Sequence, residues 1–245
     1  MAVLDHYENS GDRNLLSRAY YYAGSVAYDL GDAPAGVEYF QRAMDALADT
    51  TDLQFRSALN FRIGFLLLDQ CVYEPSLEYF KTSYMLEQRK DTLMMIYCLE
   101  KQAFAFGDSH FGDSALYYFD KAKSLAETLK DSVLVKRISA SMASYYLEIN
   151  NYAKADNCLR PYLKYVNHID KIPFYSMMAE VCINTGRYEE AYPYCVEMLE
   201  KGTLYSRMNA CRLLIEYHSA RNDVRNASRY IDLYDKYTDS VRVIE

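Results

Sequence analysis

Few residues of this chain have the types and spacing that catalysis or metal binding requires. The four histidines lie far apart and mostly near expected turns, at His6, His110, His168 and His218. A catalytic histidine needs a reacting group or an orienting partner within hydrogen-bond reach, and nothing in the spacing supplies one. Glu189 and Glu190 are adjacent, but they stand at the expected start of a helix, where the helix dipole favours carboxylates. A structural role accounts for all six residues.

The cysteines and the known catalytic motifs give the same result. The sequence contains no GxGxxG, GxxxxGK[ST], HExxH or GxSxG pattern. The six cysteines form no CxxC pattern, and most lie among apolar residues at helical spacing, as small core residues do: Cys71, Cys98, Cys158, Cys182, Cys195 and Cys211. We predict a protein that is not an enzyme and that has no cofactor, no metal site and no catalytic residue.

Composition and charge narrow the class of partner. The 245 residues are 51% hydrophobic and 25% charged, and their formal net charge is −7. Binding to nucleic acid or to an anionic membrane starts from a basic surface, and no run rich in lysine or arginine occurs. The longest apolar stretch, 65–68, is too short to span a bilayer, and the first residues lack the pattern of a signal peptide. We therefore expect a soluble chain that itself contacts neither nucleic acid nor membrane.

The elements that would position any site come from an internal repeat. Five aspartates precede helical runs at spacings of 40, 39, 40 and 39 residues: Asp12, Asp52, Asp91, Asp131 and Asp170. An aspartate there accepts hydrogen bonds from the free N–H groups of the first helical turn. A second series of bulky residues follows the same period, each with a small residue four positions earlier: Phe40, Phe80, Phe119, Leu159, Cys195 and Ile231.

Each unit is expected to be a hairpin of two amphipathic helices. Small residues such as Gly24 and Gly36 let the helices cross closely, and most turns contain glycine, asparagine or aspartate. We predict an all-α chain, an α–α superhelix (solenoid) of about six hairpins with a period of about 36–40 residues. The array is expected to fill 1–245 as one domain, in units 12–51, 52–90, 91–130, 131–169, 170–202 and 203–245.

The set Gly24, Gly36, Phe40 and Ala43 resembles the tetratricopeptide repeat (TPR) family, as do the aromatic residues of three turns, Tyr73, Tyr152 and Tyr188. The resemblance covers nearly the whole chain, although the usual TPR period is about 34 residues. The stretches 12–46 and 230–241 are similar to the TPR ectodomains of Bacteroidetes-type membrane-associated regulators. That similarity implies a periplasmic ectodomain of a larger signalling or transcription-regulating protein; a cytoplasmic location is the alternative.

In a stacked array the first helices of the hairpins line the concave side. Their face that does not pack within the hairpin carries aromatic and charged residues. The predicted groove contacts are Arg18, Tyr21, Tyr28, Phe61, Phe65, Asp69, Tyr97, Glu100, Phe104 and Arg137. Aromatic rings flanked by carboxylates suit an extended peptide or a helix with apolar and basic side chains. The other interpretation is that individual rings pack against neighbouring repeats.

The sequence thus favours a non-enzymatic TPR module that binds a protein or peptide segment in its groove. It would form the sensory or regulatory part of a larger bacterial protein. The alternative is a soluble scaffold or adaptor for the assembly of protein complexes, and homo-oligomers through the end repeats are also open. A third hypothesis is an intracellular peptide-sensing regulator like those of Gram-positive quorum systems, for which an N-terminal DNA-binding domain would be expected.

Overall fold

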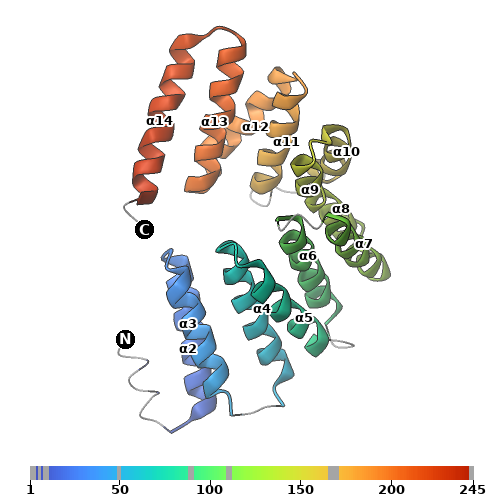
Figure 1. Cartoon of the computed structure of the whole chain (residues 1–245), viewed down its shortest axis with the longest axis vertical. Coiled ribbons are helices and arrows are strands. Elements are labelled where there is room, and N and C mark those ends of the chain that lie inside the picture. The colour runs from blue at the N-terminus through green and yellow to red at the C-terminus, as the bar shows by residue number, and fades with distance from the viewer. Residues whose placement is uncertain are drawn as a thin grey trace. The chain divides into compact units, whose positions relative to one another are not determined.

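The computed structural model describes residues 4, 7, 11–48, 51–87, 91–108, 112–164 and 171–242. Every regular element in these residues is a helix (Figure 1), which confirms the all-α prediction. None of these helices combines the length and the apolar sequence that crossing a bilayer requires. The chain divides into two compact units, Met1–Lys130 and Asp131–Glu245.

The first unit contains the helices α2 (Arg13–Asp29), α3 (Ala33–Ala46), α4 (Leu53–Asp69), α5 (Tyr73–Glu87), α6 (Thr92–Asp108) and α7 (Gly112–Thr128). The second unit contains α8 (Ser132–Ser141), α9 (Ala143–Glu148), α10 (Tyr152–Leu163), α11 (Ile172–Asn184), α12 (Tyr188–Lys201), α13 (Leu204–Ala220) and α14 (Val224–Arg242). Only Met142 separates α8 from α9, so these two segments together take the place of one first helix.

Successive helices pack as hairpins, as the repeat predicts. In the first unit α2 packs with α3, α4 with α5, and α6 with α7. In the second unit α10 packs with both α8 and α9, α11 with α12, and α13 with α14. The second helix of a hairpin also contacts the first helix of the next one within each unit, for example α3 with α4 and α12 with α13. TPR-like helical hairpins therefore form the described part of both units.

The aspartates that precede the first helices act as N-caps. The Asp12 carboxylate accepts hydrogen bonds from the backbone N–H groups of Asn14 and Leu15 at 3.1 and 3.0 Å. Asp52, Asp91 and Asp131 accept equivalent bonds from the first turns of α4, α6 and α8. These bonds satisfy donors that a helix leaves free at its start. Asp170 lies outside the described residues.

Each described turn inside a hairpin has one residue in the left-handed backbone region. In five hairpins this residue follows the first helix: Gly31, Cys71, Asn150, Gly186 and Asn222. The next N–H then donates to a carbonyl five residues back, as from Asp32 to Ala27 at 2.9 Å. This is the hydrogen bond of a Schellman motif, which ends a helix and reverses the chain. The glycine and asparagine of the turns therefore have a backbone role.

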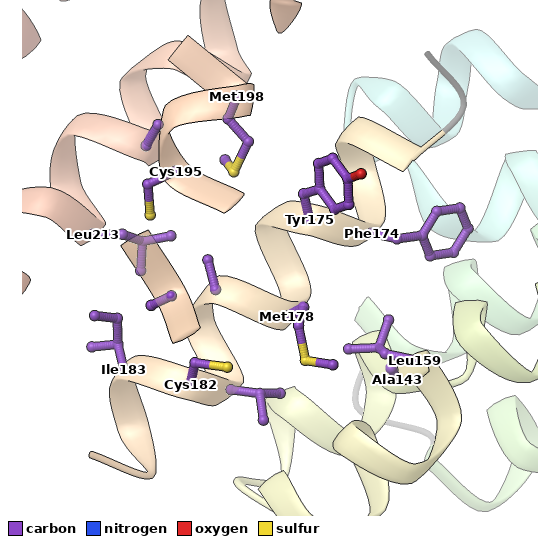
Figure 2. Packing of buried hydrophobic residues seen from close by; sticks show 14 of the residues in the cluster. Ala143, Leu159, Phe174, Tyr175, Met178, Cys182, Ile183, Cys195, Met198 and Leu213 are labelled. Atoms are coloured by element: carbon purple, nitrogen blue, oxygen red, sulfur yellow. The ribbon is translucent and has the colours of Figure 1, made fainter. Parts of the chain in front are cut away.

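The core follows the second repeat series. Phe40, Phe80 and Phe119 are almost completely buried in the first unit, and Leu159 and Cys195 are buried in the second. Figure 2 shows the second cluster, in which side chains from α10, α11, α12 and α13 meet. The last member of the series, Ile231 on α14, is instead 46% exposed, because among the described helices α14 packs mainly against α13.

Candidate functional site

Nine of the ten predicted groove residues lie on the first helices of the first unit. Arg18, Tyr21 and Tyr28 belong to α2; the others are Phe61, Phe65 and Asp69 on α4, and Tyr97, Glu100 and Phe104 on α6. Arg137 lies on α8 in the second unit. The candidate site is therefore built from α2, α4 and α6.

Several of the predicted aromatic residues pack against buried rings of their own hairpin. The ring centroids are 5.4 Å apart for Tyr21 and Phe40, and 5.6 Å apart for Phe61 and Phe80. Phe104 meets Phe119 edge-on at 5.4 Å. Such ring contacts stabilise the core, and the three predicted rings remain partly exposed. Glu100 is only 3% exposed and therefore lies inside the protein, whereas Arg18 and Asp69 are exposed.

A small pocket opens where the first two hairpins meet, and it contains two of the predicted residues. Tyr28 and Phe65 stand edge-to-face there, with ring centroids 5.7 Å apart. The pocket has a volume of about 130 Å³ and is lined by Ser25, Tyr28, Asp29, Phe40, Arg62, Phe65 and Leu66. Apolar side chains and groups of both charges thus meet in a space suited to one side chain rather than to a cofactor.

Charges of both signs act on this pocket. Burial raises the pKa of Tyr28, and the carboxylates of Asp69 and Asp29 raise it further, while Arg62 opposes them. The Tyr28 hydroxyl therefore stays protonated and can donate a hydrogen bond. Arg62 itself donates from Nε to the Tyr21 hydroxyl at 3.3 Å. With Asp29 and Arg62 in its lining, the pocket can bind either a positively or a negatively charged group of a ligand.

Two basic side chains of this surface were missed by sequence reasoning. One is Arg62, and the other is Lys101, whose Nζ lies 5.0 Å from the ring centroid of Phe65 and 5.2 Å from that of Phe104. Arg18 lies similarly over Phe55, at 5.0 Å. Cation–π contacts of this kind place positive charge beside the rings. Basic residues one helical turn from aromatic ones, such as Lys101 and Phe104, were the available signal.

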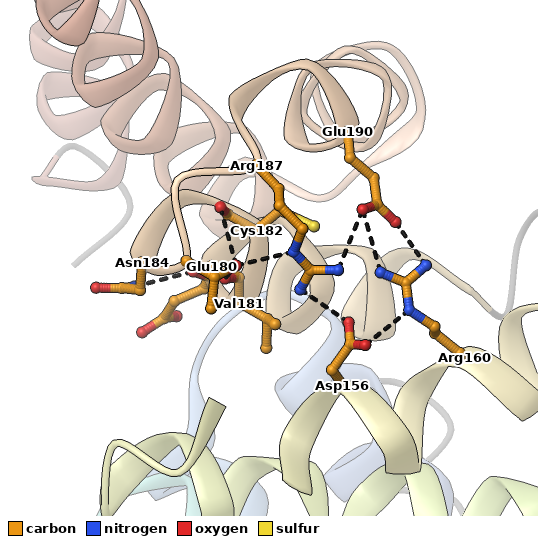
Figure 3. A network of polar contacts seen from close by, with 9 residues as sticks. Asp156, Arg160, Glu180, Val181, Cys182, Asn184, Arg187 and Glu190 are labelled. Atoms are coloured by element: carbon orange, nitrogen blue, oxygen red, sulfur yellow. Dashed lines mark hydrogen bonds and ion pairs between the residues drawn. The ribbon is translucent and has the colours of Figure 1, made fainter. Parts of the chain in front are cut away.

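The second unit contains a four-residue ionic network that joins α10 to the start of α12 (Figure 3). Asp156 accepts from Arg160 Nε at 2.7 Å and from Arg187 Nη2 at 2.9 Å. Glu190 pairs with the same two arginines at 2.6 and 3.2 Å. Burial alone would raise the pKa of Asp156, but the hydrogen bonds from both arginines outweigh it and lower that pKa. The two arginines and the two carboxylates neutralise one another. Because they come from α10 and from the start of α12, the network links two hairpins.

The remaining reactive groups have structural surroundings. His218 Nδ1 lies 3.0 Å from Asp223 Oδ2, and its ring stacks on Tyr230. The other three histidines lie outside the described residues. Burial raises the pKa of the Cys98 and Cys195 thiols to about 12. The described residues contain no group of three or more histidine, cysteine, aspartate or glutamate side chains that could hold a metal ion.

Four of the six cysteines are buried, as expected for core residues: Cys98, Cys182, Cys195 and Cys211. Cys158 is half-buried and Cys71 is exposed. All six are free thiols.

No model of a protein family matches this chain, and no curated protein does. Solved structures do resemble it. The Rap conjugation gene regulator of plasmid pLS20, in complex with the Phr* peptide, superposes with a TM-score of 0.74 at 14% identity, covering 89% of this chain and 62% of that one. This chain thus spans less than two-thirds of that regulator.

Two further structures share the arrangement. Aspartyl phosphate phosphatase F from Bacillus subtilis gives a TM-score of 0.68 at 16% identity, covering 95% of this chain and 73% of the phosphatase. TTC0263, a TPR protein from Thermus thermophilus, gives 0.59 at 20% identity, covering 81% and 99%. At these identities the likeness concerns the fold alone: the chain has the fold of TPR-type helical repeat proteins.

Proposed function

We propose that this chain is a non-enzymatic module that binds a protein or peptide segment across α2, α4 and α6. The pocket between the first two hairpins is the observation that carries the proposal. It lies on the helices that line the concave side in TPR arrays, and Phe40, Phe65 and Leu66 give it an apolar part. A bound segment would insert one side chain there as an anchor, as peptide grooves commonly require.

The chemistry of the pocket restricts the anchor. A volume of about 130 Å³ admits a single side chain. The anchor's body would contact Phe65 and Leu66, and its polar end would reach Asp29 or Arg62. Neighbouring residues of the segment would pass the rings of Phe61 and Phe104. The peptide complex of the Rap regulator, a protein with the same kind of fold, supports a peptide as the class of ligand.

A blocking substitution tests the proposal. In the repeat alignment Ser25 occupies the position held by Phe65 and Phe104, so this position tolerates phenylalanine in two other hairpins. Ser25→Phe should fill the pocket without unfolding α2. The probe is a peptide selected from a random-peptide phage library on the full chain. We expect Ser25→Phe to weaken its binding at least about tenfold, measured by fluorescence anisotropy.

Thr82→Phe provides the matched control. Thr82 Oγ1 donates to the carbonyl four residues back, as Ser25 Oγ does, but Thr82 lies exposed on α5 and outside the pocket. Binding to this variant should remain unchanged. The proposal fails if no library peptide binds more tightly than about 100 μM, or if both variants bind alike.

The cellular context is the finer part of the proposal. We propose that the module belongs to a larger, membrane-associated bacterial regulator, with the repeats in the periplasm. Cell fractionation and intact-mass measurement of the native protein should then find a membrane-bound species well above 28.5 kDa. A soluble species of 28.5 kDa would instead support the cytoplasmic adaptor.

A further inference from the structure

The outer face of α2 exposes a continuous row of large apolar side chains. Leu15, Tyr22 and Val26 on α2 are 46%, 67% and 56% exposed, and Leu30 at its C-cap is 74% exposed. Ala19, Ala23 and Ala27 lie among them, and the small residues leave an apolar groove of about 400 Å³ that Leu4 and Tyr39 also line. An exposed apolar row of this extent on one helix indicates a binding surface.

The equivalent faces of α4 and α6 are buried against a neighbouring hairpin. In the alignment that matches Gly24 with Gly64 and Ala103, the positions of Ala19, Ala23 and Val26 correspond to Leu59, Ile63 and Leu66 on α4, and to Cys98, Gln102 and Ala105 on α6. All six equivalents are at most 2% exposed. The second helix of the preceding hairpin packs on each of these helices, α3 on α4 and α5 on α6. The face of α2 thus continues the interface between repeats.

The spacing of the row favours a paired helix. Leu15, Ala19, Tyr22 and Val26 follow one another at intervals of 4, 3 and 4 residues. This is the narrow seam of a two-helix coiled coil. A seam of small and large residues can interlock with another only where large side chains meet small ones.

The middle of the row, 19–26, meets this condition against a second copy of itself. With a two-fold axis between Tyr22 and Ala23, antiparallel pairing sets Val26 of each copy against Ala19 of the other. It also sets Tyr22 against Ala23. Leu15 and Leu30, at the ends of the row, would then meet as two large side chains. Antiparallel helices oppose their dipoles favourably.

The opposite end of the chain does not offer a matching apolar face. The exposed surface of α14 is mainly charged: Arg225, Arg229, Asp232, Asp235 and Lys236. Charged outer faces are typical of helices that cap a repeat array. Head-to-tail association, which would need α14 to cover α2, is therefore disfavoured against a closed two-fold contact.

We propose that two copies of this chain associate through α2 in an antiparallel, two-fold symmetric dimer. The contact shares no residue with the pocket lined by Ser25, Tyr28 and Asp29, so it is independent of peptide binding.

Sedimentation velocity of the full chain tests the dimer over a range of concentrations. Val26→Glu places a charge in the seam, and symmetry places it there twice, so we expect the dissociation constant to rise at least about tenfold. Met85→Glu is the matched control, because Met85 is 66% exposed on α5, away from the seam. This control should dimerise like the unchanged chain.

Cross-linking tests the geometry. Ala23 lies next to the proposed axis, so Ala23→Cys in a Cys71→Ser background should form a disulfide-linked dimer under mild oxidation. Met85→Cys in the same background should not. The proposal is overturned if the chain is monomeric at all concentrations, which would leave the groove to another protein or to the chain's own N-terminal residues. It is also overturned if a dimer forms whose dissociation constant Val26→Glu leaves unchanged and which Ala23→Cys does not cross-link.

Discussion

At Gly24 the two helices of the first hairpin approach so closely that a side chain has no room. A β-carbon there would lie 2.9 Å from the Phe40 ring and 3.1 Å from the carbonyl oxygen of Gly36. Phe40 is 1% exposed and Gly36 O belongs to the backbone, so neither can move away easily. We expect Gly24→Ala to destabilise the chain by about 1–3 kcal/mol, measured by urea unfolding.

The sign of this change is informative, because helix propensity acts in the other direction. In an exposed helix, alanine in place of glycine stabilises by about 1 kcal/mol. The equivalent position of the third hairpin is Ala103, which is completely buried. Ala103→Gly is the control and should also destabilise, since it loses both propensity and packing. A stability gain for Gly24→Ala would contradict the close crossing.

Residue types reveal the close crossings and the caps, but not the surface of the site. Gly24, Phe40 and the capping aspartates were predictable because their residue types suit local features, the start of a helix or the close crossing of two helices. Arg62 and Lys101 were not, because the position of a long side chain depends on which rings the neighbouring helix brings near it. The pocket depends on the same tertiary contact between α2 and α4.

At the scale of elements, the ionic network fixes α10 against α12 and makes that contact depend on pH. The folded protein holds the Asp156 pKa below its usual value, so this carboxylate stabilises the fold above its unfolded pKa. The contribution is lost as the pH falls through the lowered pKa. We expect Asp156→Asn to cost about 1 kcal/mol near neutral pH, a modest value because the partners are partly exposed.

Urea unfolding at several pH values checks this expectation. The stability difference between Asp156→Asn and the unchanged chain should shrink below about pH 4, where the unfolded carboxyl becomes protonated. Asp120→Asn, on the exposed face of α7, should show little difference at any pH. A constant difference down to strongly acidic pH would mean that the loss comes from packing rather than from charge.

The elements themselves were largely predictable, since each hairpin repeats its caps, its turn and its bulky core position. The deviations have physical causes. Leu159 and Cys195 replace the phenylalanine of the first three hairpins, so the sequence signal is weaker in the second unit. Ile231 keeps the sequence pattern but is exposed, because the pattern reports the helix face and not whether another helix covers it.

At the scale of the whole molecule, the chain divides after Lys130, at the turn between the third and fourth predicted hairpins. The sequence predicts one continuous array, because a repeat of nearly constant period carries no signal at this division. Each unit has a buried cluster of its own: one joins α2, α3 and α4, and the other extends from Ala140 to Leu214.

A cluster confined to one unit implies that the unit can fold by itself. The fragment 131–245 retains Asp131, which caps α8, and every residue of the second cluster. We expect it to be helical by circular dichroism and to unfold cooperatively in urea, since stacked repeats need only their neighbours. The shorter fragment 152–245 lacks Ala140 and Ala143 and uncovers Ala155 and Leu159 on α10, so it should be clearly less stable. If 131–245 is unfolded while the full chain is folded, the second unit depends on the first, and the chain behaves as the single array that its repeat period predicts.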